Sequence, residues 1–480
     1  ATLISGDIHG RGGGSQVIVT SAVEQPLWGG KLRLNGRVFS NPYNANEADF
    51  VHVPDEHLEH EHDDDNVFQT EAGLNFERPF GERLKLELVG LRQDKDEVFA
   101  SAFDAPGDAE RFRNDSRTAE TIVRGVLKFQ QRPTLSWEAG GEGAYNTLDS
   151  KTGFVLNGAP ITLPAANVRV EEKRGELFGK ATWRPMSNLT LEAGIREEGS
   201  QIASSGDVRL EKSLYFTKPR LLITWAPDAD TQVRLRYERV VGQLDFGAFV
   251  ASTSLSAGVI TAGNPNLEPE KAWVSEAAIE RRFLGHGAVV ATLRHSELTD
   301  VVDRAPFGNF DAPANIGDGT KDELILNLTL PFDRIGMKGA QLRATSTWRR
   351  SEVTDPTTHT TRPITRLRPN EWEAHFVQDL PARRMSWGFD ICCARIETIY
   401  RFNEVEVRKL DNFVALFTEW KPKADLNLRF EYDYLTRFGY RRTLYHYAGP
   451  RGAAPLAYVE DRDPHFGHVL YVRVRKTFGG

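Results

Sequence analysis

The sequence predicts an all-β fold, a transmembrane antiparallel β-barrel with short turns at one end and long loops at the other. Three observations lead to this prediction. Apolar and polar residues alternate repeatedly along the 480-residue chain, strands end in aromatic–proline turns, and no stretch is apolar enough for a membrane-spanning helix. The mean hydropathy of −0.44 fits such a barrel, because only alternate residues of each strand face lipid.

The alternation is clearest in a few stretches. Apolar residues hold every second position in the ranges 84–88, 189–195, 233–237, 324–330 and 426–434. Because successive strand side chains point to opposite faces, Leu428, Phe430 and Tyr432 are predicted to face lipid. Arg429 and Glu431 lie between them and are predicted to face the interior. A soluble β-sandwich shows the same alternation. The connections between strands are therefore needed to distinguish a sandwich from a membrane barrel.

The connections favour the membrane barrel. Trp183, Trp225 and Trp420 are each followed two positions later by proline, and an alternating segment begins a few residues further on. This arrangement is typical of a strand that leaves lipid through an interfacial aromatic girdle, so these residues predict a periplasmic girdle. The opposite connections are long and polar, over 41–66, 94–115, 149–167, 245–271, 306–320, 352–369 and 445–464. These are predicted to be extracellular loops.

Composition excludes other classes of protein. A net charge of −7 argues against a nucleic-acid partner. No nucleophile–base arrangement rises above chance, so an enzyme is not predicted. The two cysteines, Cys392 and Cys393, are neighbours, and in a strand they would point to opposite faces. We therefore predict free thiols, with neither a disulfide framework nor metal-site spacing.

Residues 55–66, DEHLEHEHDDDN, concentrate imidazole and carboxylate side chains in one predicted outer loop. His57, His60 and His62 are candidate nitrogen ligands, and Asp63 a candidate oxygen ligand, for a divalent metal such as zinc. Their spacing is not that of a metalloprotease. The alternative, which we prefer, is a solvated acidic loop that binds no metal. Apart from this candidate divalent metal in the 52–66 loop, the sequence predicts no cofactor.

Residues 263–273, GNPNLEPEKAW, lead from a polar stretch into a predicted strand. Proline disfavours helical backbone in the residue before it, so this phrase is extended or turning. The phrase resembles the barrel domain of TonB-dependent outer-membrane receptors, in which it leads from an outer loop into a strand that returns towards the periplasm. The residues that carry the resemblance are Asn264, Pro265, Asn266, Leu267, Pro269 and Glu270. Residues 296–302, SELTDVV, are similar to the family's continuation.

The resemblance implies a barrel of 22 strands, of which about 20 can be counted in this sequence. It assigns residues 1–480 to one barrel domain and places the family's N-terminal plug outside this sequence. It implies a receptor in the outer membrane of a Gram-negative bacterium, surrounded by lipid and lipopolysaccharide. In the family, the TonB complex acts on the plug and drives uptake of a scarce nutrient, such as a ferric siderophore or another metal complex.

Two other functions stay open at this point. An empty barrel of this size would act as a passive, porin-like channel. A barrel-anchored surface adhesin or scaffold would use the long loops to bind a protein partner. The sequence does not identify the ligand.

Overall fold

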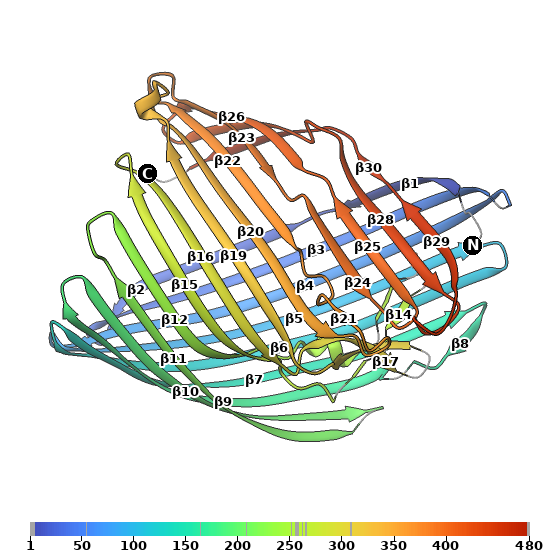
Figure 1. Ribbon diagram of the computed structural model, residues 1–480, viewed down its shortest axis with the longest axis horizontal. Helices are drawn as coiled ribbons and strands as arrows, with labels where there is room; N and C mark the ends of the chain where they lie inside the picture. Colours follow the sequence, from blue (N-terminus) through green and yellow to red (C-terminus); the bar gives the residue numbers. More distant parts are fainter. Residues whose placement is uncertain are drawn as a thin grey trace.

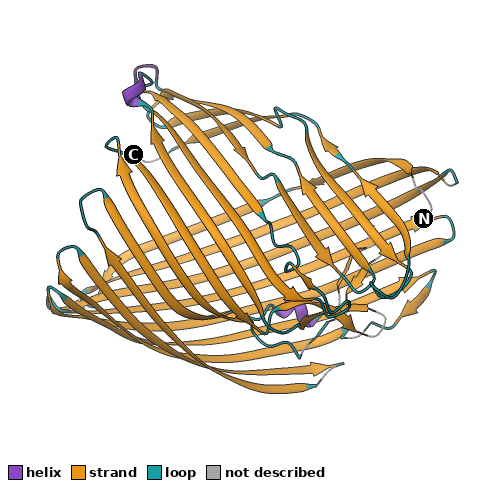
Figure 2. Ribbon diagram, in the orientation of Figure 1, coloured by secondary structure: helices purple, strands orange, loops and turns teal. Residues whose placement is uncertain are grey.

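The computed structural model describes residues 5–53, 55–163, 165–207, 209–250, 252–254, 259–261, 263–264, 266–307 and 310–477. Long antiparallel strands form a strongly curved sheet around an interior, and helical turns are few and short (Figures 1 and 2). The short 3₁₀ helices among the described residues are η1 (Phe246–Phe249), η3 (Asp333–Ile335) and η4 (Pro381–Arg383). In the described chain, no helix has the length and apolar character needed to span a membrane. The predicted all-β class is confirmed.

The main sheet has 22 strands and follows the order of the chain by antiparallel pairing. Its strands are β1 (Ser5–Gly14), β2 (Val17–Leu27), β3 (Gly30–Val53), β4 (His57–Phe80), β5 (Leu84–Ala105), β6 (Asp108–Arg132), β7 (Leu135–Leu156), β8 (Ala159–Ile161), β9 (Asn167–Met186), β10 (Leu189–Gly206), β11 (Leu210–Trp225), β12 (Thr231–Val241), β15 (Lys271–Phe283), β16 (Gly287–Thr299), β19 (Gly319–Pro331), β20 (Ala340–Thr354), β21 (Thr361–Arg362), β22 (Asn370–Leu380), β23 (Met385–Cys392), β26 (Phe413–Lys423), β27 (Leu426–Asp433) and β31 (Val469–Lys476). β1 and β2 lie end to end along β3. Within the described residues, β2 pairs only with β3 and β31 only with β27.

Two smaller sheets lie where the long connections gather, on the right of Figure 1. One contains β13 (Ser252–Ser254), β14 (Val259–Thr261), β17 (Val302–Phe307) and β18 (Phe310–Asn315). The other contains β24 (Arg395–Tyr400), β25 (Glu404–Leu410), β28 (Phe438–Tyr447), β29 (Leu456–Arg462) and β30 (His465–Phe466). We call this end of the molecule the long-loop rim, and the opposite end, where short turns join the strands, the short-turn rim.

Several predicted loops are strands. β3 and β4 continue in register through the predicted loop at 41–66, with Asn46 opposite His62. β5 and β6 do the same through 94–115, with Phe99 opposite Asn114. The backbone N–H and C=O groups of these extensions stay paired in the ladder, whatever the polarity of their side chains. Polarity alone therefore did not distinguish a loop from a strand that extends beyond the apolar band.

The two faces of the main sheet differ as the alternation predicts. Large apolar side chains stand exposed on the outer face, for example Leu177 (70%), Leu293 (62%) and Val123 (63%). An exposed apolar surface of this kind marks contact with lipid or another apolar partner. The buried apolar side chains lie mainly at the long-loop rim. There Phe249 of η1 packs with Leu148 and Ile202, which belong to β7 and β10.

Cys392 and Cys393 are joined by a disulfide, so the prediction of free thiols is wrong. The prediction assumed a continuous strand, in which neighbouring side chains point to opposite faces. Instead β23 ends at Cys392 and β24 begins at Arg395. Cys393 has a φ of 79°, a conformation that turns the chain and lets the two sulfurs meet.

Candidate functional site at the interior wall and the long-loop rim

Charged side chains on the inner face form a ladder of ion pairs that runs from strand to strand. Arg236 of β12 contacts Glu276 at 2.6 Å, and Glu276 contacts Arg294 at 2.8 Å. Arg294 contacts Glu323 at 3.1 Å, and Glu323 contacts Arg349 at 3.1 Å. The ladder arises because alternate residues of each strand face inward and neighbouring strands are in register. Opposite charges therefore balance across a polar interior wall.

A basic hollow lies on the same wall over β6–β12. Its volume is about 360 Å³, and its lining includes Arg124, Phe178, Arg196 and Lys218. Basic side chains outnumber acidic ones in the lining, and Arg196 and Lys218 also contact Glu176 at 2.8 and 2.5 Å. The guanidinium groups of Arg124 and Arg196 lie 4.9 and 5.2 Å from the centre of the Phe178 ring. A Cβ atom at Gly140 would come within 2.6 Å of that ring, so glycine there leaves room for it. Guanidinium groups beside an aromatic face suit a ligand that is anionic and partly planar.

At the long-loop rim, a buried group of charges ties distant connections together. We call Asp303, Asp355, Arg362, Tyr400 and Arg451 the rim cluster. Arg362 contacts Asp303 at 2.8 Å and Asp355 at 2.6 Å, and Arg451 also contacts Asp355 at 2.6 Å. Both guanidinium groups lie over the Tyr400 ring, at 4.6 and 5.6 Å from its centre. The four charged residues are all less than 9% exposed.

The rim cluster connects four parts of the chain. Asp303 lies in β17, Asp355 directly follows β20, Tyr400 ends β24, and Arg451 lies between β28 and β29. Burial alone would raise the pKa of Asp355. Hydrogen bonds from Arg451 and from the backbone N–H groups of Thr358 and Thr357 outweigh it and lower the pKa to about 2. Asp355 therefore stays ionised over the physiological pH range, and its contacts with Arg362 and Arg451 join distant connections at the rim.

A second buried carboxylate at the rim, Asp311, has a raised pKa, whereas the pKa of Asp355 is lowered. The Asp311 carboxylate of β18 accepts hydrogen bonds from the Phe402 backbone N–H at 3.0 and 3.2 Å. Burial raises the pKa of Asp311 to about 6, which the Phe402 N–H and the charges of Arg304 and Arg401 only partly offset. Protonation of Asp311 thus begins just below neutral pH.

The closed rim around Asp311 should become more stable to local opening as the pH falls. The folded-state pKa of Asp311 exceeds its ordinary value of 3.8, so the folded rim binds a proton more tightly than the unfolded chain does. Between pH 7 and pH 5, the free energy of local opening is expected to rise by about 1 kcal/mol. Hydrogen exchange of segment 310–315, corrected for the intrinsic chemical rate, measures this change. Asp311→Asn should remove the pH dependence, and an equal dependence in this variant would contradict the assignment.

The phrase at 264–270 lies at the long-loop rim, directly before β15. The Asn264 amide donates to the Pro313 carbonyl at 2.8 Å, and the Glu268 N–H donates to the Asn315 side chain at 2.9 Å. Leu267 is only 1% exposed. Asn266 donates its N–H to the Asn264 side chain at 3.0 Å. The phrase thus docks the start of β15 on the β17–β18 hairpin.

The other three residues of the phrase that carry the resemblance are Pro265, Pro269 and Glu270. Glu270 accepts a hydrogen bond from the Val302 N–H at 3.3 Å, which again joins the phrase to β17. Pro269 is buried. Pro265 lies outside the described residues. The contacts assign the phrase a role in positioning the rim.

The three tryptophans lie at the opposite end, the short-turn rim. Trp183 is opposite Leu191 near the β9–β10 turn, and Trp225 is opposite Leu189 of the same β10 segment. Trp420 lies opposite Met385, near the β26–β27 turn. Each is 43–49% exposed. That this rim faces the periplasm stays a prediction.

The candidate histidine ligands lie in strand β4, not in a loop, which corrects the predicted location. Alternation along the strand places His57 and Asp63 on one face and His60 and His62 on the other. His57 contacts Glu59 at 3.0 Å, and His62 contacts Asn46 at 2.8 Å and Asp64 at 3.0 Å. Throughout the described part of the chain, no three or more metal-ligating side chains are arranged to hold an ion. A divalent metal site in this segment and the preferred alternative, a solvated acidic segment that binds no metal, both stay predictions.

Sequence reasoning missed the rim cluster. Its members are spread from Asp303 to Arg451 with no repeating spacing, and each resembles an ordinary polar loop residue. The density of arginine and aspartate in the predicted long loops was the only available signal.

Comparison with known proteins agrees with this architecture. A family profile described as "TonB dependent receptor-like, beta-barrel" matches residues 23–361. No curated protein matches the sequence. The ferric-catecholate import receptor Fiu from E. coli K12 is similar in structure, with a TM-score of 0.63 and 11% identity over 99% of this chain and 82% of that one.

Two further solved structures are similar. The pyoverdine outer membrane receptor FpvA from Pseudomonas aeruginosa PAO1 has a TM-score of 0.58 and 12% identity, covering 100% of this chain and 79% of that one. The copper transporter OprC has a TM-score of 0.55 and 11% identity, covering 98% and 80%. At such identities the likeness concerns the fold.

Proposed function

This chain belongs to the TonB-dependent receptor β-barrel family, and on that premise we propose that it forms the membrane domain of a receptor for active nutrient uptake across a Gram-negative outer membrane. The proposal is carried by one observation. The main sheet has an apolar outer face and a charged inner face, and its long connections gather at a single rim. This combination suits a wall between lipid and a polar path, with the binding region at one mouth.

The interior wall supports a ligand class. Arg124 and Arg196 flank Phe178 in the basic hollow, and Lys218 lines the same hollow. Cationic groups beside an aromatic ring would hold an anionic chelate, such as a ferric siderophore or another metal complex. The TonB complex, acting through a plug, would supply the energy. Lipid and lipopolysaccharide would contact the apolar outer face. The family and its structural neighbours are receptors and transporters, and no enzymatic step is proposed.

Uptake by living cells tests this function. The natural gene would be expressed in a Gram-negative strain that lacks its own receptors for iron complexes. We expect accumulation of at least one labelled ferric siderophore from a panel, and we expect it to stop when TonB is deleted or the proton gradient is collapsed. Uptake that continues without TonB would instead support a passive channel. Failure to accumulate any complex, together with capture of a protein through the long loops, would support a surface scaffold.

A matched pair of variants tests the basic hollow. Arg196→Ala is expected to weaken binding of the transported anionic complex roughly tenfold, because a hydrogen bond to a charged group contributes about 1.5–3 kcal/mol. Arg113→Ala is the control, because Arg113 is exposed and pairs with Asp115 on the outer face of β6. Equal affinities for both variants, measured by calorimetry on purified protein, would remove the hollow from the ligand's path.

A further inference from the structure

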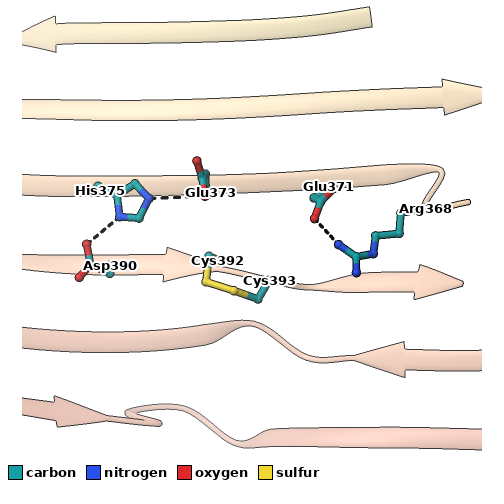
Figure 3. Close-up of a disulfide and its surroundings, with 7 residues drawn as sticks. All are labelled: Arg368, Glu371, Glu373, His375, Asp390, Cys392 and Cys393. Atoms are coloured by element: carbon teal, nitrogen blue, oxygen red, sulfur yellow. Dashed lines mark hydrogen bonds and ion pairs between the residues drawn. A yellow bond between two sulfur atoms is a disulfide. The ribbon is translucent and has the colours of Figure 1, made fainter. Parts of the chain in front are cut away.

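The end of β23 brings together several groups that bind metals. Cys392 is the last residue of the strand, and its disulfide to Cys393 is drawn in Figure 3 with the side chains around it. Glu373 lies directly opposite Cys392 on β22, and His375 lies directly opposite Asp390. These four residues occupy alternate positions on two neighbouring strands, so they share one face of the sheet. Asp390 lies 3.9 Å from Arg429 of the interior wall, so this face borders the interior.

The histidine is already oriented. Its Nδ1 is 2.7 Å from the Asp390 carboxylate, while its Nε2 points towards Glu373 at 3.6 Å (Figure 3). A carboxylate that holds one ring nitrogen fixes the tautomer and presents the other nitrogen to a metal. Two ligands of a tetrahedral zinc ion are separated by about 3.4 Å, given bond lengths of roughly 2.0–2.2 Å. The separation of Nε2 from the Glu373 oxygen is close to this value.

We propose that the Cys392–Cys393 disulfide masks a metal site and that its reduction lets Cys392, His375 and Glu373 bind a divalent transition-metal ion of the zinc class, with Asp390 as a positioning residue. One thiolate, one imidazole and one carboxylate form a ligand set that zinc accepts, and a fourth position stays open to water or an exogenous ligand. The site is distinct from the basic hollow and does not depend on the proposed transport function.

The disulfide prevents this site from forming. A sulfur bonded to another sulfur carries no thiolate charge, and the thiolate is the form that binds metal. The described residues of this disulfide-bonded structure contain no arranged group of three ligands. Reduction adds two electrons and two protons and yields two thiols. With a phosphine as reductant, phosphorus is oxidised to the phosphine oxide, whose oxygen comes from water. Metal binding then displaces the proton of the Cys392 thiol.

Reduction also frees the backbone. Cys393 has a φ of 79°, a region that residues with a Cβ atom rarely occupy. Without the disulfide, the chain can return to extended geometry between β23 and β24. In an extended strand, Cys393 would point away from the face that carries Cys392. Cys392 is therefore assigned as the single sulfur ligand.

Cobalt(II) is the probe for the test, because its absorption reports both thiolate ligation and tetrahedral geometry. The full chain, purified in detergent, would be titrated with Co²⁺ before and after treatment with a water-soluble phosphine and its removal. We expect a thiolate-to-cobalt band only after reduction, and we expect Zn²⁺ to displace it. Bands of equal strength in the oxidised and reduced protein, or none in either, would overturn the proposal.

Two serine variants make the test specific. Cys393→Ser leaves the Cys392 thiol free and should bind Co²⁺ without any reductant. Cys392→Ser should give no thiolate band in either state. His375→Ala should abolish binding, and Asp390→Asn should weaken it roughly 10–100-fold, as loss of an orienting partner does. His286→Ala should change nothing, because the exposed His286 lies in the turn between β15 and β16, outside β22 and β23. Circular dichroism and thermal melting would establish that each variant is folded. A folded Cys393→Ser variant that does not bind would refute the assignment.

Discussion

Replacement of Arg362 by leucine is expected to destabilise the long-loop rim by about 3–5 kcal/mol, the cost of breaking a buried ion pair by removing one partner. Only 6% of the Arg362 side chain is exposed, and it contacts both Asp303 and Asp355. Leucine would leave these two carboxylates buried with one of their cations missing. The cost arises from the charges that remain, because a carboxylate out of water needs a counter-charge or hydrogen bonds.

Hydrogen exchange would locate this effect. Segments 302–307 and 355–365 should exchange faster in Arg362→Leu, while segment 189–195, in β10 near the short-turn rim, should keep its rate. Arg350→Leu is the matched control, because 78% of the Arg350 side chain is exposed and its partner Glu352 stays in water. An exposed pair contributes about 0.2–1 kcal/mol. Similar exchange profiles for the two variants would show that burial of the rim cluster does not stabilise the rim.

Leu326→Arg is expected to destabilise the membrane-embedded sheet by about 2–4 kcal/mol, the cost of an arginine at a lipid-facing site near the bilayer midplane. Leu326 lies in the middle of β19, between the exposed Asp322 and the strand end at Pro331. Its neighbours across the strands are Ala291 and Ser346. The same face carries Leu293 and Trp348, which are 62% and 43% exposed. This exposed apolar face is the one that lipid would cover.

Asn327→Arg is the matched control, because it places the same side chain one residue along the same strand but on the interior face. There Asn327 accepts a hydrogen bond from Thr345 at 3.1 Å, and water can solvate a new charge. Thermal unfolding in detergent and in lipid bilayers would compare the two variants. An equal loss of stability for both would contradict the assignment of faces. Leu428 is a weaker test site, because it lies opposite Trp420, close to the short-turn rim.

The alternation along each strand was sufficient to predict the two faces of the sheet. Phe430 and Tyr432 are the more exposed positions of β27, whereas Arg429 contacts Glu419 at 3.1 Å and Glu431 at 2.6 Å on the inner face. This success has a local cause. Side-chain direction in a strand depends only on the parity of the residue, so periodicity in the sequence reports it directly.

The connections were predicted less well. The segment 41–66 contains the polar residues of a loop, yet most of it is strand, because β3 and β4 continue to pair beyond the apolar band. The backbone makes the same hydrogen bonds whatever the polarity of the side chains, so the length of the ladder is set by the partner strand. For this reason the candidate histidines of 57–62 are divided between two faces.

The sequence by itself determined the class of fold, the two faces and the short-turn rim, since each depends on residues that are neighbours in the chain. Tertiary structure decided the rim cluster, in which Asp303, Asp355 and Arg451 meet across long separations in sequence. It also decided the surroundings of Cys392, because strand register alone brings Glu373 and His375 beside that end of β23. Buried charges and metal ligands interact only when their side chains lie a few ångströms apart. Strand register and the tertiary path of the connections set these distances, and no local sequence pattern encodes either one.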